Sequence, residues 1–362
     1  MGKTVANLTR FKETLPTKFN GVKLKHTPSF STPSRFIKAE GQTADRLLIR
    51  PELARIFYFL QLPAGLALSL WKRAQRFGFY RIPFDGIRLI RQFNYIEFWK
   101  ILSVLTLPNV RPALIRYPRN CYKYFGNYLS LSFSTEFRAR ALAYHYNYLD
   151  SHFNNCFMDR IMNGQILIWE EIKNDCHFSI RLGYPHDGTD SEGDLSLIFY
   201  SDDLLLYTIN FSIVPGEIFN LSSYPVIFVG RIQGSRGCFE YIKHATKSFE
   251  ELPPSTLLIT AAQALSKVLG ITTMVGVRNN DQICVGIGDN SSLSDTCQAY
   301  DKLWISLGSQ RLNDKLNILT FGGEKPLNMI RNHHRSRVKR QRHLKSEFIN
   351  TMGGTFKANC LD

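Results

Sequence analysis

The stretch PVIFVGRIQGSRG (Pro225–Gly237) sets the fold prediction for this chain. It predicts an apolar strand that ends in a polar turn containing glycines. FEYIKHATKSFEELPPSTLLITAAQALSKVLG (239–270) follows as helix, and ITTMVGVRN (271–279) returns as strand. A glycine turn before a helix presents backbone N–H groups, and the helix dipole favours negative charge there. We therefore expect a binding site for an anionic cofactor at Arg231, Gln233, Gly234, Ser235, Arg236 and Gly237.

Apolar alternation predicts five strands before this turn, at 166–169, 177–182, 194–200, 204–213 and 226–232. DGTDSEG (187–193) links the second and third strands, and SDD (201–203) makes a tight turn between the third and fourth. After the turn we expect a helix at 254–269, strands at 271–277 and 282–287, and a helix at 300–307. The predicted fold is α+β, a helical N-terminal region followed by a largely antiparallel mixed sheet with helices.

The chain divides into four predicted regions. Residues 1–50 are basic and proline-punctuated and are expected to be poorly ordered; 51–165 form short helices, 166–330 the α+β core, and 331–362 a basic helix or tail. IFYFLQLPAGLALSLW (Ile56–Trp71) carries no charge. Because a membrane span needs about 20 apolar residues, we favour a buried helix pair there over an interfacial segment, and that over a span.

Composition indicates a globular protein of the cytoplasm. Apolar residues make up 44% of the 362 residues, and the seven cysteines form no CxxC pair, as in reduced proteins without a metal site. The N-terminus has no continuous apolar run typical of a signal peptide. The sequence also shows no Ser-His-Asp order, HExxH helix or Walker loop, which argues against ordinary hydrolases, zinc proteases and P-loop NTPases.

Charge is distributed unevenly along the chain. Residues 1–145 hold 24 Lys and Arg against 7 Asp and Glu, residues 146–330 hold 13 against 21, and residues 331–362 hold 8 against 2. The basic flanks either pack on the acidic middle or bind an anionic partner. In the C-terminal run the candidates for binding an anionic surface are Arg335, Arg337, Lys339, Arg340 and Arg342. The adjacent apolar and aromatic segments favour an anionic membrane. Nucleic acid, for which no binding motif is visible, is the minor alternative.

Four blocks carry a resemblance to a known family. SEGDLSLIF (Ser191–Phe199), GRIQGS (Gly230–Ser235), HATKSFEELPPSTLL (His244–Leu258) and AYDKLWISLGS (Ala299–Ser309) resemble successive blocks of the VirK/YbjX family of Gram-negative bacteria. The resemblance covers about 129–345 and departs at EELPP (Glu250–Pro254), where a Gly-Leu-Arg-Pro-like turn is usual. It implies a role in virulence and in envelope properties such as resistance to cationic antimicrobial peptides, in a family without an established biochemical activity.

The order of predicted elements also resembles the Gcn5-related N-acetyltransferase fold. In that fold a turn with Arg or Gln followed by glycines binds the pyrophosphate of acyl-coenzyme A, which makes acyl-coenzyme A the candidate small-molecule donor here. This chain does not reproduce the Gln/Arg-x-x-Gly-x-Gly/Ala spacing. The alternative is a purely structural turn with Arg231 in an ion pair.

Catalytic candidates are carboxylates in the family-like blocks. Glu192 and Asp301 are the main candidates for a general base, with Asp194, His145 and His244 behind them. Tyr300 and Trp304 share a helical face, so core packing next to a capping Asp301 is the alternative. We expect an envelope protein at the cytoplasmic side of the inner membrane, either an acyltransferase-like enzyme or a non-catalytic regulatory or binding protein.

Overall fold

A computed structural model describes residues 93–186, 188–221, 224–283, 293–322 and 326–361, with the backbone alone over 293–299, and a few single positions between 55 and 87. The expectations for 1–50 and for most of Ile56–Trp71 concern residues outside these ranges. The main helices are α4 (Tyr95–Leu105), α5 (Arg111–Arg116), α6 (Thr135–His152), α7 (Phe157–Asn163), α8 (Phe239–Ser248), α9 (Pro254–Val268), α10 (Leu293–Ser306) and α11 (Asn332–Cys360). Short 3₁₀ turns connect several of them, including η2 (Pro118–Cys121) and η3 (Lys123–Phe125).

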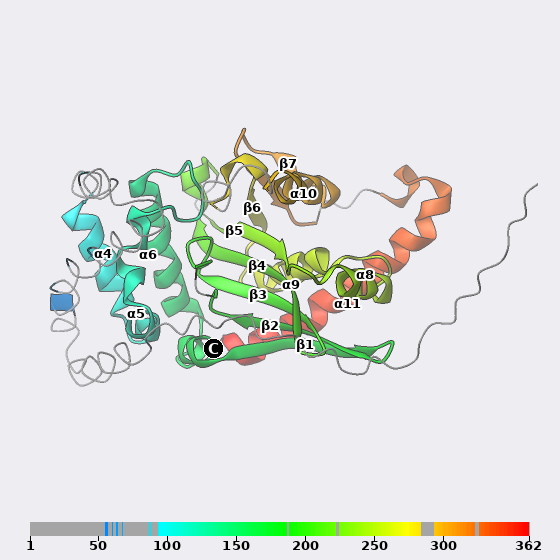
Figure 1. Ribbon diagram of the computed structural model, residues 1–362, viewed down its shortest axis with the longest axis horizontal. Coiled ribbons are helices and arrows are strands. Elements are labelled where there is room, and N and C mark those ends of the chain that lie inside the picture. The colour runs from blue at the N-terminus through cyan, green and yellow to red at the C-terminus, as the bar shows by residue number, and fades with distance from the viewer. Residues whose placement is uncertain are drawn as a thin grey trace, which may run out of the picture.

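The strands form one mixed sheet in the order β1-β2-β3-β4-β5-β6-β8-β7. Their bounds are β1 (Gln165–Lys173), β2 (Cys176–Gly183), β3 (Leu195–Ser201), β4 (Leu204–Pro215), β5 (Pro225–Gly234), β6 (Thr273–Val277), β7 (Gln310–Arg311) and β8 (Leu316–Thr320). Strands β1 to β5 are an antiparallel meander, and β6 pairs parallel to β5 through three residue pairs. In Figure 1, α4, α5 and α6 gather at one end of this sheet and α8 and α10 at the other.

The predicted fold class and the five predicted strands are confirmed. The turn between β3 and β4 has Asp202 and Asp203 at φ 47° and 62°, the double left-handed conformation of a tight hairpin turn. Strands β7 and β8 were not predicted. Of the strand expected at 282–287, only Gln282 and Ile283 are described, and neither lies in a strand.

Helices pack on both faces of the sheet. Trp169 of β1 meets Phe348 of α11 at 4.7 Å between ring centroids, and Phe348, Met352, Phe356 and Cys360 are buried at helical spacing. On the opposite face, the start of β3 and the end of β4 pack under α6, where Tyr146 and His145 contact Asp194 and the amide of Ile213. The aromatic residues of this region belong to the core: Phe133, Tyr148 and Phe153 are buried, and Phe137 and Tyr144 are partly exposed and pack against it.

Candidate functional site

The predicted glycine turn lies between β5 and α8. Arg231, Gln233 and Gly234 end the strand, and Ser235–Cys238 forms a turn in which the Cys238 amide donates to the Ser235 carbonyl at 3.4 Å. Gly237 has φ +77°, which suits glycine at this turn position. Arg236 and Gly237 are exposed, and α8 begins without a side-chain cap on its first amides. The local arrangement predicted from sequence, a strand, a glycine turn and a helix start, is therefore present.

Gly234 is held by packing. A Cβ at this position would lie 2.9 Å from Cε2 of Tyr207 and 3.2 Å from Cδ1 of Ile242. The amide of the next residue, Ser235, donates to the carbonyl of Leu206 at 2.9 Å, so it continues the ladder to β4. Gly234 is therefore needed for the packing of the sheet at this end of the strand, as expected for a purely structural turn.

Two of the predicted site residues bind each other. Nη1 of Arg231 lies 2.5 Å from Oε2 of Glu192, and the side chains are 19% and 3% exposed. The Glu192 carbonyl also packs on Gly230, where a Cβ would approach it to 2.3 Å; here β5 has one extra residue opposite β4, a β-bulge. The ion pair that the sequence left as an alternative is thus formed, and it occupies both the proposed phosphate ligand and the proposed base.

Asp301 is engaged in a second ion pair. Its Oδ2 lies 2.9 Å from Nη2 of Arg278, and its Oδ1 accepts from the Asn279 amide at 3.3 Å. The hydrogen bond to Asp301 raises the pKa of Arg278. Tyr300 and Trp304 are buried as expected, with the Ile232 amide donating to the Tyr300 hydroxyl at 2.8 Å. Asp301 therefore joins α10 to the residues that follow β6.

Cross-strand register places the predicted residues on one polar face. Arg181 pairs with Ile198, Ile198 with Thr208, and Thr208 with Gln233, so these side chains lie on the same side of the sheet. A parallel row runs through Gln165, Gly183, Ser196, Asn210 and Arg231. We call these residues the polar face. In the second row Ser196 Oγ donates to Asn210 Oδ1 at 2.5 Å, and the Asn210 amide donates to the Thr189 carbonyl at 3.1 Å.

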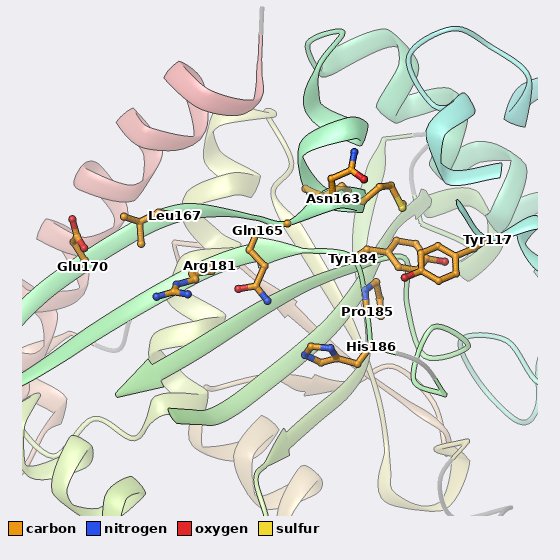
Figure 2. Close-up of a pocket in the computed structure, with 12 residues that line it drawn as sticks. Tyr117, Asn163, Gln165, Leu167, Glu170, Arg181, Tyr184, Pro185 and His186 are labelled. Atoms are coloured by element: carbon orange, nitrogen blue, oxygen red, sulfur yellow. The ribbon is translucent and has the colours of Figure 1, made fainter. Parts of the chain in front are cut away.

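At its β1–β2 edge the polar face opens into a pocket of about 710 Å³. Figure 2 shows Gln165 between Arg181 on one side and Tyr184 and His186 on the other, with Asn163 at the end of α7 above them. The full lining is Tyr117, Ile161, Met162, Asn163, Gly164, Gln165, Leu167, Glu170, Arg181, Tyr184, Pro185 and His186. None of these residues was predicted from the sequence, because they come from separated segments that only the fold brings together.

Asp194, one of the weaker catalytic candidates, is the centre of a buried polar cluster. Its carboxylate pairs with the Lys123 ammonium, and it accepts hydrogen bonds from Tyr128, from Ser212 at 2.7 Å and from Tyr146 at 3.1 Å. Burial opposes ionisation of Asp194, but Lys123 and these donors outweigh it and lower its pKa to about 2. The cluster is closed to solvent, which makes it a structural element between η3, α6 and the sheet.

The two histidine candidates do not belong to the turn Ser235–Cys238. His145 is buried, and its Nδ1 accepts from the Ile213 amide at 3.0 Å. Burial lowers the pKa of His145 to about 4, so the ring is neutral at pH 7. His244, on the outer side of α8, approaches Cys176 at 4.0 Å between Nδ1 and Sγ. His145 therefore contacts the backbone, whereas His244 contacts a thiol whose pKa is raised by burial.

The basic C-terminal run forms the first half of α11. Arg335 folds back on the carbonyls of Ile330 and Asn328, and Arg340 pairs with Glu250 at 2.9 Å. Arg342 also interacts within the protein. Arg337 and Lys339 are exposed. Part of the run therefore contacts the acidic middle, and part faces outward, where binding of an anionic partner stays a prediction.

No metal site or membrane span occurs in the described ranges. There, no three or more His, Cys, Asp or Glu side chains are grouped to hold a metal ion. The same ranges contain no helix with the length and apolar character to cross a membrane.

Comparison with known proteins identifies the family. The sequence profile described as "Protein of unknown function (DUF535)" matches residues 87–352. The chain belongs to this family, which is the VirK/YbjX family, as its four sequence blocks indicated. No curated protein and no solved structure matches the chain significantly.

Proposed function

We propose that the protein acts in the bacterial envelope, at the cytoplasmic face of the inner membrane, as an acyltransferase-like protein that binds acyl-coenzyme A. The observation that carries the proposal is the turn Ser235–Cys238 between β5 and α8, followed by the parallel strand β6. This order of elements, with α8 and α9 between the two strands, resembles the one in which Gcn5-related acetyltransferases bind the donor's pyrophosphate.

The donor site uses Arg236 in place of Arg231. Arg231 is neutralised by Glu192, whereas Arg236 is exposed and forms no ion pair within the described part of the chain. The uncapped first turn of α8 adds amides and the positive end of a ten-residue helix. An anion at the turn would therefore contact one free guanidinium and several backbone donors.

Thermal shift and urea unfolding with coenzyme A, acetyl-coenzyme A and a long-chain acyl-coenzyme A test the donor site. A ligand at 100 times its Kd stabilises the folded protein by about 2.7 kcal/mol. Arg236→Gln should reduce that stabilisation, while Arg140→Gln, at an exposed ion pair with Glu217, should not. A folded wild-type protein that no coenzyme A species stabilises contradicts the proposal.

A non-catalytic binding protein is the second candidate, and the ion pairs favour it. Glu192 and Asp301, the two predicted bases, are each bound to an arginine. An assay for free coenzyme A thiol distinguishes the enzyme from the binding protein. It uses the isolated protein, acyl-coenzyme A and candidate acceptor amines. Binding without thiol release supports the binding protein, and acceptor-dependent release supports the enzyme.

The membrane part of the proposal rests on the exposed start of α11. Each Lys or Arg near an anionic bilayer contributes about 1 kcal/mol, so replacing Arg337 and Lys339 by Gln should weaken vesicle partitioning by about 2 kcal/mol, or about 30-fold. Sedimentation with phosphatidylglycerol or cardiolipin vesicles measures it, and high salt should release the protein. Lys100→Gln with Arg140→Gln, on α4 and α6 at the other end of the molecule, is the matched control.

Neutral vesicles and duplex DNA complete the vesicle experiment. Phosphatidylcholine vesicles should bind little protein. Tight binding of duplex DNA without binding to anionic vesicles at low salt would replace the membrane by nucleic acid as the partner.

A further inference from the structure

We infer that the pocket at the β1–β2 edge of the polar face binds a carbohydrate of about disaccharide size. The inference is independent of the proposed donor turn, because Arg181 and Gln233 lie three strand spacings, about 14 Å, apart across the sheet. It rests on the pocket's volume, its aromatic wall and its balanced polar groups.

The volume fits a ligand larger than an ion. The pocket of about 710 Å³ lies within the range of about 300–1,000 Å³ typical of small-molecule sites. At about 30 Å³ per water molecule it holds about 24 waters. A phosphate ion would leave most of this space to water, whereas a sugar of two rings would displace a large part of that water.

The aromatic wall is rigid. Tyr117 and Tyr184 stack with their ring centroids 4.6 Å apart and their planes 13° apart. The hydroxyl of Tyr184 donates to Oδ1 of the buried Asn120 at 2.9 Å, which fixes the inner ring and through it the half-buried Tyr117. A flat, partly exposed tyrosine backed by a second ring provides an apolar surface for the C–H face of a sugar.

The polar groups are both donors and acceptors, and they are held in place. The Gln165 amide hydrogen-bonds Tyr200 at 3.0 Å, and Arg181 is bound to Asp203 at 2.9 Å and lies over the Tyr200 ring. Hydroxyl groups donate and accept at once, so amides, a carboxylate and a guanidinium match them together. Preorganised groups of this kind reduce the ordering cost of binding.

The balance of charge disfavours the other ligand classes. Glu170 and Arg181 contribute one charge of each sign to the lining. A polyanion would meet the Glu170 carboxylate, and an acyl chain would have to desolvate the polar groups of Asn163, Gln165 and Glu170 without hydrogen-bonding them. A neutral polyhydroxylated ligand avoids both costs.

Saturation-transfer NMR and calorimetry with maltose and N-acetylglucosamine test the inference, with inorganic phosphate and sodium decanoate as comparisons. No coenzyme A is present, so the outcome is separate from that of the donor test. At about 10 mM sugar, a site with a Kd of about 1 mM is mostly occupied. We expect saturation transfer from the protein to at least one of the two sugars.

Two variants locate the binding. Asn163→Ala with His186→Ala removes two exposed lining side chains and leaves the core intact, and it should weaken binding about tenfold. Tyr117→Leu should weaken it similarly by removing the aromatic face. Tyr95→Leu, which breaks a comparable tyrosine stack with Trp99 on α4, is the matched control and should bind as the wild type does.

Three results overturn the inference. They are a folded wild-type protein that binds neither sugar, sugar binding that the Asn163/His186 variant retains at full affinity, and binding of phosphate or decanoate that this variant abolishes while sugars do not bind. Because the double variant alters only exposed positions, an unfolded Tyr117→Leu protein does not prevent the decision.

Discussion

Replacing Lys123 by Met should destabilise the protein strongly at pH 7 and far less under acid conditions. Lys123 and Asp194 form an ion pair with side chains only 4% and 0% exposed. Removing the ammonium group leaves a carboxylate without its counter-charge in the interior. Breaking a buried pair from one side typically costs about 3–5 kcal/mol.

The buried carboxyl group sets an upper limit on that loss. Without Lys123, Asp194 escapes the cost of a buried charge by taking up a proton. For a group with an ordinary pKa of 3.8, protonation at pH 7 costs about 4 kcal/mol, at about 1.36 kcal/mol per pH unit. We therefore expect a loss of about 3–4 kcal/mol at pH 7, and we expect the loss to shrink by about 3 kcal/mol at pH 4.5.

Urea unfolding of both proteins at the two pH values measures the effect. Arg140→Met, at the exposed ion pair with Glu217, is the control and should change stability by less than about 1 kcal/mol. Adding Asp194→Asn to Lys123→Met should recover most of the loss at pH 7, because no charge is then buried. A loss below about 1 kcal/mol, or an equal loss at pH 7 and pH 4.5, would refute the reasoning.

Three further changes test local features. Gly234→Val should lower the free energy of unfolding by about 1–3 kcal/mol, since its Cβ meets the Tyr207 ring; unchanged urea stability would contradict the packing role. Burial lowers the pKa of His145 from 6.5 to about 4, so the stability that the neutral ring contributes is complete above pH 6.5 and is lost as the pH falls through 4. The loss should amount to about 3 kcal/mol. His145→Gln should remove this pH dependence from urea midpoints measured across the range. Glu251 has φ 62°, so Glu251→Gly should raise stability by up to about 1 kcal/mol, and a lower melting temperature would count against this strain.

Local patterns predicted the sheet well because its signals are local. Alternating apolar residues and the Asp202–Asp203 turn lie within a few residues of the structure they specify, so strands β1 to β5 could be predicted from sequence. Strand β8, LNILT, has only five residues, and it was not predicted although Asn313–Asp314 and Gly322–Gly323 flank it. The structured glycine turn was predicted for the same local reason.

Local sequence patterns could not predict contacts between residues that lie far apart in the chain. Lys123 and Asp194 are 71 residues apart, and Arg340 and Glu250 are 90 apart, so no spacing rule connects them. The pocket is a further example, because Tyr117, Gln165 and His186 meet only through the stacking of helices on β1 and β2. Glu192 and Arg231 were both selected as candidates, yet their pairing follows from the β-bulge at Gly230 and not from sequence distance.

The polar face limits how a donor at the turn and a sugar in the pocket could cooperate. The row through Ser196 and Asn210 is covered by the carbonyl of Thr189, and Arg231 by Glu192. The row between Arg181 and Gln233 instead passes through the buried Ile198 and the half-buried Thr208. Ligands bound at both sites would approach each other over Thr208, one row away from Glu192. The sequence-predicted bases therefore lie outside the shortest path between the two sites, and a transfer reaction along that path would need its proton acceptor from the ligands or from the Thr208 row.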